Sequence, residues 1–227
     1  MKMCTESKNI PIDVGSPEPS GRRDRKRIAT RQAISAAATR LFNERGFDHV
    51  TVDEISEAAG VGRMTVFNYF PRKEDMFFDR DEEGRDVLRR AFRERDPTVS
   101  PIETLRLLAH RLVAEGVPYL EFSAESQRFI MTIEASETLK ARARTIRDEL
   151  TAIVANEAAE SVGRPSGDTD AHLTAALLLA TWTAAIIEAH RAYRLSGEVD
   201  KARSTLLSLI DRGSSGVKVA LAATPYA

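Results

Sequence analysis

The sequence predicts an all-α protein, with an N-terminal three-helix helix-turn-helix domain followed by a helical bundle. Two observations predict this fold class. Apolar residues recur at helical spacing along most of the chain, with no strand-like alternation. Residues 51–73 then combine two short helical patterns with a glycine between them, as a helix-turn-helix does. The expected units are a disordered leader over 1–21, a helix-turn-helix domain over 22–75 and a helical domain over 76–227.

The chain opens with a segment of low apolar content that ends in a basic run. Residues 1–21 hold three prolines and few large apolar side chains, which predicts a disordered leader. Because the formal net charge is −1, affinity for nucleic acid would require a local basic patch. The cations just before the first helix supply one: Arg22, Arg23, Arg25, Lys26 and Arg27. We expect a flexible arm with Arg25 and Arg27 on DNA; the alternative is a solvated tail.

Apolar faces and caps predict the first two helices. The first helix carries one amphipathic stripe, made of Ile28, Ile34, Ala37, Ala38, Leu41 and Phe42. The next helix opens at Thr51, which forms the S/T-x-x-E capping box with Glu54. Its apolar face is expected from Val52, Ile55, Ala58 and Ala59. Gly60 then ends it, because glycine reaches positive φ without steric cost.

The second helix of the motif is expected from about Gly62 to Phe70, where Pro71 stops it. Val66 and Phe70 should point inward. The side chains expected to point outward and contact DNA are Arg63, Met64, Thr65 and Tyr69. Arg63 is the candidate for base edges, because an arginine fork to guanine O6 and N7 is the commonest specific contact. The residues expected to hold phosphates are Thr51, Thr65, Tyr69 and Lys73.

These segments resemble the amino-terminal signature of the TetR family of bacterial transcriptional regulators. The matching residues are Leu41-Phe42, Gly46-Phe47, Val50-Thr51-Val52, Ile55, Ala59-Gly60-Val61, Thr65-Val66-Phe67, Tyr69-Phe70 and Lys73. The departures are Gly62 for a serine or threonine cap, Met64 for a small residue and Phe67 for a tyrosine. The resemblance implies a ligand-responsive repressor that binds a palindromic double-stranded DNA operator as a homodimer. Residues 76–227 would then be the ligand-binding and dimerisation domain.

Prolines and uninterrupted runs outline the helices of the larger domain. A helix that opens near Arg72 is expected to continue to Arg95 and to couple the two domains. Pro101 sits at the start of the first core helix, the position in a helix that proline favours. Residues 125–162 hold no proline or glycine and should be helical, with one break near 135–138.

The last two helices are the candidates for dimerisation. The segment 170–195 is apolar around most of its circumference for two thirds of its length, so it must be buried on several sides. The segment 198–212 adds one apolar face. Together they are expected to form half of a four-helix interface between two copies, as the family resemblance also implies. The alternative is an ordinary intramolecular core.

The family resemblance also implies a small-molecule effector. The candidate pocket residues are apolar side chains with a few polar anchors: His110, Phe122, Arg128, Phe129, Ile133, Trp182, Ile186, Glu188, His190 and Arg191. The alternative for each is a core or surface role. The segment from Arg128 to Arg142, with the residues around Trp182 and Arg191, resembles actinobacterial TetR-type regulators proposed to bind acyl-coenzyme A-like ligands. This resemblance implies that one or more of Arg128, Arg191 and Arg194 meet the ligand's phosphates, while an apolar channel takes the acyl chain.

Other classes of protein lack their signatures here. The chain has no G-x-S-x-G, H-E-x-x-H or phosphate loop, and its histidines 49, 110, 172 and 190 lack metal-ligand spacing. No window holds the ~18 consecutive apolar residues that span a bilayer, and Cys4 is the single cysteine. We therefore expect a cytoplasmic, nucleoid-associated protein with no catalytic residue, metal, cofactor or membrane span. A dimeric scaffold or a corepressor-dependent DNA-binding protein without an inducer pocket stays open as the alternative.

Overall fold

The computed structural model describes residues 21–227, so the leader predicted over 1–21 lies outside the described residues except for its last residue. The described chain is helical, which confirms the all-α fold class. Its first elements are α1 (Arg22–Arg45), the 3-10 turn η1 (Phe47–His49), α2 (Val52–Ala58), α3 (Arg63–Tyr69) and α4 (Lys73–Phe77). They are followed by α5 (Asp81–Arg93), α6 (Pro101–Glu115), η2 (Pro118–Leu120), α7 (Ala124–Ala135), α8 (Glu137–Ser161), α9 (Thr169–Ser196) and α10 (Val199–Ala220).

Helices α1 to α4 pack around one small hydrophobic core and are called the head below. Its buried side chains are Ile34, Ala38, Phe42, Phe47, Val50, Ile55, Val66, Phe70, Met76 and, from α8, Leu139. Val66 and Phe70 point inward as predicted. Two residues of the predicted apolar faces were placed wrongly, because Ile28 of α1 and Ala58 of α2 are exposed. Ser56 of α2 is buried although it is polar.

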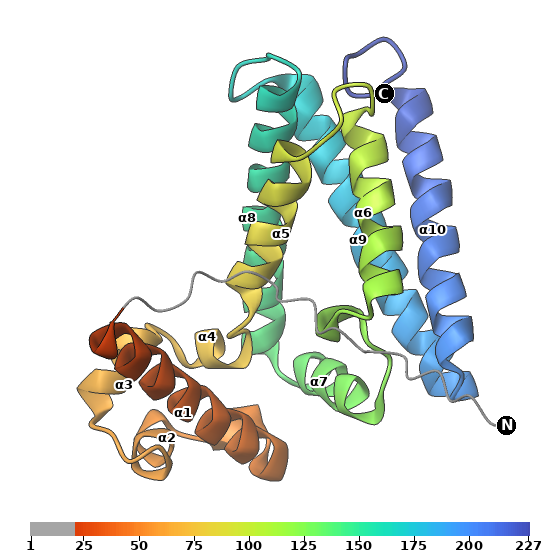
Figure 1. The fold of residues 1–227 in the computed structure, drawn as a ribbon. Helices are drawn as coiled ribbons and strands as arrows, with labels where there is room; N and C mark the ends of the chain where they lie inside the picture. The colour runs from red at the N-terminus through yellow and green to blue at the C-terminus, as the bar shows by residue number, and fades with distance from the viewer. Residues whose placement is uncertain (1–20) are drawn as a thin grey trace, which may run out of the picture.

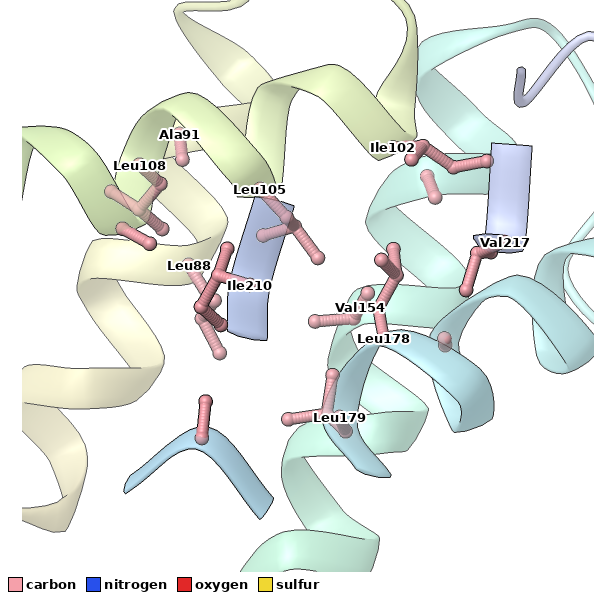
Figure 2. Packing of buried hydrophobic residues seen from close by; sticks show 14 of the residues in the cluster. Leu88, Ala91, Ile102, Leu105, Leu108, Val154, Leu178, Leu179, Ile210 and Val217 are labelled. Carbon is pink, nitrogen blue, oxygen red and sulfur yellow. The ribbon is translucent and has the colours of Figure 1, made fainter. Parts of the chain in front are cut away.

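The other helices form a bundle above the head, as Figure 1 shows. Its core draws on α5, α6, α8, α9 and α10, and Figure 2 shows Leu88, Leu105, Val154, Leu178 and Ile210 meeting there. Helices α9 and α10 lie side by side along their length (Figure 1). A Cβ added at Gly213 of α10 would lie 2.3 Å from Cγ2 of Thr181 of α9, so only glycine permits this close approach.

The single helix predicted from Arg72 to Arg95 was wrong, because the chain leaves the helical conformation between α4 and α5. Phe78 has φ −98° and ψ 41°. Contacts from α1 hold this break: Ser35 donates a hydrogen bond to the Asp79 carboxylate, and Arg31 donates one to the Asp79 carbonyl at 2.9 Å. The sequence pattern could not reveal the break, since these partners lie more than forty residues away in the chain.

The basic run was also predicted wrongly as a flexible arm. Arg22 to Arg27 form the first turns of α1, where the Arg25 N–H bonds the Gly21 carbonyl at 3.1 Å. Asp24 lies in the first turn, where a negative charge favours helix formation. The break predicted near 135–138 is confirmed, because Ser136 separates α7 from α8 and accepts a hydrogen bond from the Leu139 N–H.

Candidate nucleic-acid interface and effector region

The predicted capping box forms at the N-terminus of α2, the first helix of the helix-turn-helix. Thr51 Oγ1 accepts from the Glu54 N–H at 3.3 Å, and the Thr51 N–H donates to Glu54 Oε2 at 2.8 Å. These bonds to Thr51, with the Arg45 guanidinium 2.7 Å away, lower the pKa of Glu54 to about 2. Gly60 has φ 65° and makes the turn between α2 and α3, as predicted.

Helix α3 presents its DNA-reading candidates on an open face. Met64 is 71% exposed and Arg63 is also exposed. The Arg63 guanidinium lies 3.0 Å from the Asp53 carboxylate and 5.6 Å from the centre of the Phe67 ring. Thr65 and Tyr69 are partly exposed. The face therefore offers the Arg63 guanidinium beside the apolar side chain of Met64, and the Asp53 carboxylate holds the guanidinium in place.

Two of the predicted phosphate contacts have side chains that bind the protein itself. Lys73 Nζ donates to the carbonyls of Phe47 and Val50, both at 2.9 Å, and lies 4.2 Å from the Phe47 ring centre. Burial lowers the pKa of Lys73. The Thr51 hydroxyl donates to Glu54 at 2.8 Å. The sequence could not reveal the role of Lys73, because backbone carbonyls 26 and 23 residues away carry no pattern.

The basic side chains at the start of α1 are accessible for contact with DNA. Arg25 and Arg27 are exposed, and no ion pair links either of them to another residue of the described chain. They are fixed on a helix rather than on a mobile arm. A phosphate contact by these two residues stays a prediction.

The predicted effector residues fall into three separate places. Three belong to the contact between α7 and the head: Arg128, Phe129 and Ile133. Phe129 stacks on Phe77 with ring centres 4.6 Å apart and an interplanar angle of 9°. Ile133 packs against the hydrophobic core of the head. Arg128 faces a hollow beside η1.

A second group belongs to the core of the bundle: Phe122, which precedes α7, and Trp182 and Ile186 of α9. The Phe122 ring is 5.0 Å from that of His190, and Gln127 Nε2 lies 3.0 Å from His190 Nδ1. Burial lowers the pKa of His190, which favours the neutral ring. The buried Gln127 Oε1 and Trp182 Nε1 have no hydrogen-bond partner. The sequence contains no sign of a role for Gln127, because an isolated glutamine on a helix belongs to no motif.

The remaining candidates lie on α6 and on α9. His110 of α6 faces α10, where its Nε2 is 2.8 Å from the Asp211 carboxylate, which Arg106 also contacts at 2.9 Å. Arg191 is exposed on α9, with Glu188 3.7 Å away. The ten candidates therefore do not line one cavity, although Glu188, His190 and Arg191 line one hollow together.

Two hollows adjoin α7. The first, of about 410 Å³, lies between the head and α7 and is lined by Phe42, Asn43, Gly46, Phe47, Asp48, His49, Arg128, Met131, Thr132, Ala135 and Ser136. The second, of about 380 Å³, lies between α7 and α9 and is lined by Ile130, Glu134, Ile187, Glu188, His190, Arg191 and Arg194. We call them the head hollow and the bundle hollow. Opposite sides of α7 form one wall of each.

The described residues hold no metal cluster, and one helix is long and apolar enough to span a membrane. Within residues 21–227, no three His, Cys, Asp or Glu side chains gather as a metal ion would require. Helix α9 has the length and composition of a membrane span, a property that core helices of soluble proteins share. It packs against α8 and α10.

Comparisons with known proteins agree with this arrangement. Residues 34–79 match the bacterial regulatory proteins of the tetR family. The regulator TcmR of Streptomyces glaucescens is 34% identical over 74 residues, 33% of each chain. The repressor LfrR of Mycolicibacterium smegmatis is 36% identical over 86 residues, 37% of this chain and 41% of LfrR. The chain therefore matches between a third and two fifths of the length of these relatives.

A solved structure extends the likeness in fold beyond the head. The TetR-family repressor FadR of Thermus thermophilus, solved with lauroyl-CoA, superposes with a TM-score of 0.52 at 23% identity. The superposition covers 82% of this chain and 92% of FadR. At this identity the likeness concerns the fold alone. Residues 34–79 therefore match the amino-terminal domain of the TetR family, and the chain as a whole has the fold of the solved TetR-family structure.

Proposed function

We propose that the protein is a transcriptional repressor that binds a palindromic operator as a homodimer and leaves it when a small molecule binds. The exposed face of α3 carries this proposal. In the major groove, the Arg63 guanidinium would donate to guanine O6 and N7, while Met64 would meet an apolar group such as a thymine methyl. Both side chains project from a helix whose ends are fixed by Gly62 and Pro71.

The remaining contacts divide into phosphate binding and support of the interface. Thr65 and Tyr69 would meet phosphates beside α3, and Arg25 and Arg27 would do so from the first turns of α1. We revise the role of Thr51 and Lys73 to positioning, because one caps α2 and the other binds η1. Loss of either should weaken binding to all sequences alike.

A homodimer is supported by the outer face of α9. Only 33% of its most apolar 18-residue window is buried within one chain. Leu173, Leu177 and Ile187 are exposed on it, at the spacing of one helical face. A two-fold copy would cover this surface and present two heads to two half-sites.

The effector is proposed to bind between α7 and α9. The buried and unpaired Gln127 Oε1 and Trp182 Nε1 could pair with polar groups of a ligand, since unpaired buried polar atoms are costly. Arg191 and Arg194 line the bundle hollow and could take phosphates, as an acyl-coenzyme A-like effector would need. FadR of T. thermophilus was solved with lauroyl-CoA, which makes acyl-coenzyme A the first class to test.

The operator proposal is tested by selecting fragments of genomic DNA with the purified protein at near-physiological salt. We expect enrichment of a palindrome with half-sites about one helical turn apart. Arg63→Ala should weaken binding by about 1–3 kcal/mol and relax selectivity at one base pair of each half-site. Arg111→Ala, an exposed arginine of the bundle, is the matched control. Equal binding by Arg63→Ala and wild type would remove Arg63 from the interface.

A protein without an inducer pocket is the second candidate, because the predicted effector residues do not converge on one cavity. It would be a dimeric scaffold or a DNA-binding protein that needs a corepressor. Long-chain acyl-coenzyme A, added to the purified protein, separates the candidates: a sensor gains thermal stability and loses its operator. For either candidate we propose a cytoplasmic, nucleoid-associated protein without enzymatic activity.

A further inference from the structure

Helix α7 is the least securely packed helix at the junction of head and bundle. None of its twelve residues is fully buried. It lies between the two parts of the molecule in Figure 1, and its two sides form walls of the two hollows. A helix held in this way can shift at low cost when a ligand fills the space on one side of it.

The head hollow combines an apolar floor with one guanidinium group and one imidazole ring. Its floor includes the rings of Phe42 and Phe47, whose centres are 5.0 Å apart. Met131 is 55% exposed in its wall and has the adaptable side chain of many ligand sites. The Arg128 guanidinium and the His49 ring also line it, and neither is ion-paired with any residue between 21 and 227. Asp48, the one acidic lining residue, already accepts a hydrogen bond from Ser136 at 2.9 Å.

We propose that the head hollow binds a small organic anion with a flat aromatic body, and that this ligand controls DNA binding through the head. The volume of about 410 Å³ suits such a molecule. Its ring would lie on the phenylalanine floor against Met131, and its carboxylate would pair with Arg128. This site lies on the opposite side of α7 from the effector site proposed in the bundle and is lined by residues of the head.

The head hollow is connected to the helix-turn-helix through η1. Its floor contains η1, and the carbonyls of Phe47 and Val50 at either end of this turn both accept from Lys73 Nζ at the start of α4. Val50 is followed directly by Thr51, the cap of α2. A ligand that displaces η1 therefore moves the first residues of α2 and α4 together. Because α7 also walls the bundle hollow, occupancy of either hollow changes the affinity of the other.

The test uses 2-naphthoate as the probe and 2-naphthamide, its neutral counterpart, as the control ligand. Calorimetry on the full chain without DNA should detect naphthoate binding that is at least about tenfold tighter than naphthamide binding. Arg128→Gln should abolish this preference, and Ala135→Trp should block both ligands by filling the hollow. Arg191→Gln, which removes a cation from the bundle hollow, should leave both affinities unchanged.

Three results would overturn the proposal: no binding of either probe at millimolar concentration, equal binding by Arg128→Gln and wild type, or loss of binding in Arg191→Gln alone. The regulatory part rests on the proposed function and is measured separately, as naphthoate-dependent release of a selected operator. If operator selection fails while binding still depends on Arg128, the ligand site stands and the repressor proposal falls. If naphthoate binds at Arg128 but leaves operator affinity unchanged, control through the head is wrong.

Discussion

The head is joined to the bundle by two contacts of opposite chemistry. One is apolar: Phe129 and Ile133 of α7 and Leu139 of α8 pack into or against the core of the head. The other is ionic and centres on Arg142 of α8. Apolar burial is roughly proportional to area and tolerates small shifts, whereas ion pairs depend on geometry, salt and pH. We infer that the apolar contact keeps the head attached and the ionic contact sets its angle.

The ionic contact exploits the break between α4 and α5. Arg142, whose side chain is 15% exposed, lies 3.1 Å from Asp75 on α4 and 3.5 Å from Asp81 on α5. It is also 3.3 Å from Glu149. Arg85 meets Asp81 and Glu149 from the other side. A continuous helix from α4 to α5 would change the relative positions of Asp75 and Asp81, so the break lets one arginine bind both.

The largest expected effect comes from the apolar contact. Leu139→Ala should lower the free energy of unfolding by about 3 kcal/mol, because it removes a fully buried side chain and leaves a cavity. Urea denaturation followed by circular dichroism measures it. Arg111→Ala, at an exposed arginine of α6, is the control and should change stability by less than about 0.5 kcal/mol. A loss in Leu139→Ala as small as that would mean that α8 does not anchor the head.

The ionic contact should contribute less to stability and more to operator affinity. Arg142→Met leaves Asp75 and Asp81 without their shared cation and should cost about 1–2 kcal/mol, between exposed and buried pairs. Adding Asp75→Asn should recover part of this loss, which a double-mutant cycle measures. Arg147→Met, at an exposed arginine of the same helix, is the control. Additive losses would show that Arg142 and Asp75 do not interact.

The features that the sequence could predict are those that depend on nearby residues. The cap at Thr51, the turn at Gly60 and the inward Val66 depend on neighbours within a few residues, so the pattern alone predicted them. The role of Lys73 and the break after Phe77 depend on partners 23 to 48 residues away. Residues chosen for the effector site by side-chain type were scattered for the same reason, since helix packing decides which ones meet.

A smaller effect is expected for the stacked pair between α7 and the head. Phe129 is 39% exposed, so Phe129→Ala should lower the free energy of unfolding by about 1 kcal/mol, including the lost stacking on Phe77. The loss should stay the same between about 0.05 and about 0.5 M salt, roughly a third of the physiological ionic strength and roughly three times it. The loss in Arg142→Met should shrink over this range. Identical salt responses would contradict the division into apolar and ionic contacts.

The smallest expected effect is a pH response confined to the ionic contact. A hydrogen bond from Arg85 holds the pKa of Glu149 below its usual 4.5, against the opposing effect of burial. Because the folded state then binds this proton less readily than the unfolded state, the stabilisation is present above pH 4.5 and is lost as the pH falls through the lowered pKa.

The melting temperature of Glu149→Gln should therefore lie below that of wild type at neutral pH, and the gap should narrow as the solution is acidified below pH 4.5. Glu160→Gln, at an exposed glutamate of α8, controls for the loss of one negative charge. The gap between Phe129→Ala and wild type should not narrow, because neither aromatic ring titrates. The difference in melting temperature between Glu149→Gln and wild type could instead stay constant until the protein unfolds in acid. Glu149 would then not contribute to the ionic contact, and Asp75 and Asp81 would be the partners that hold Arg142.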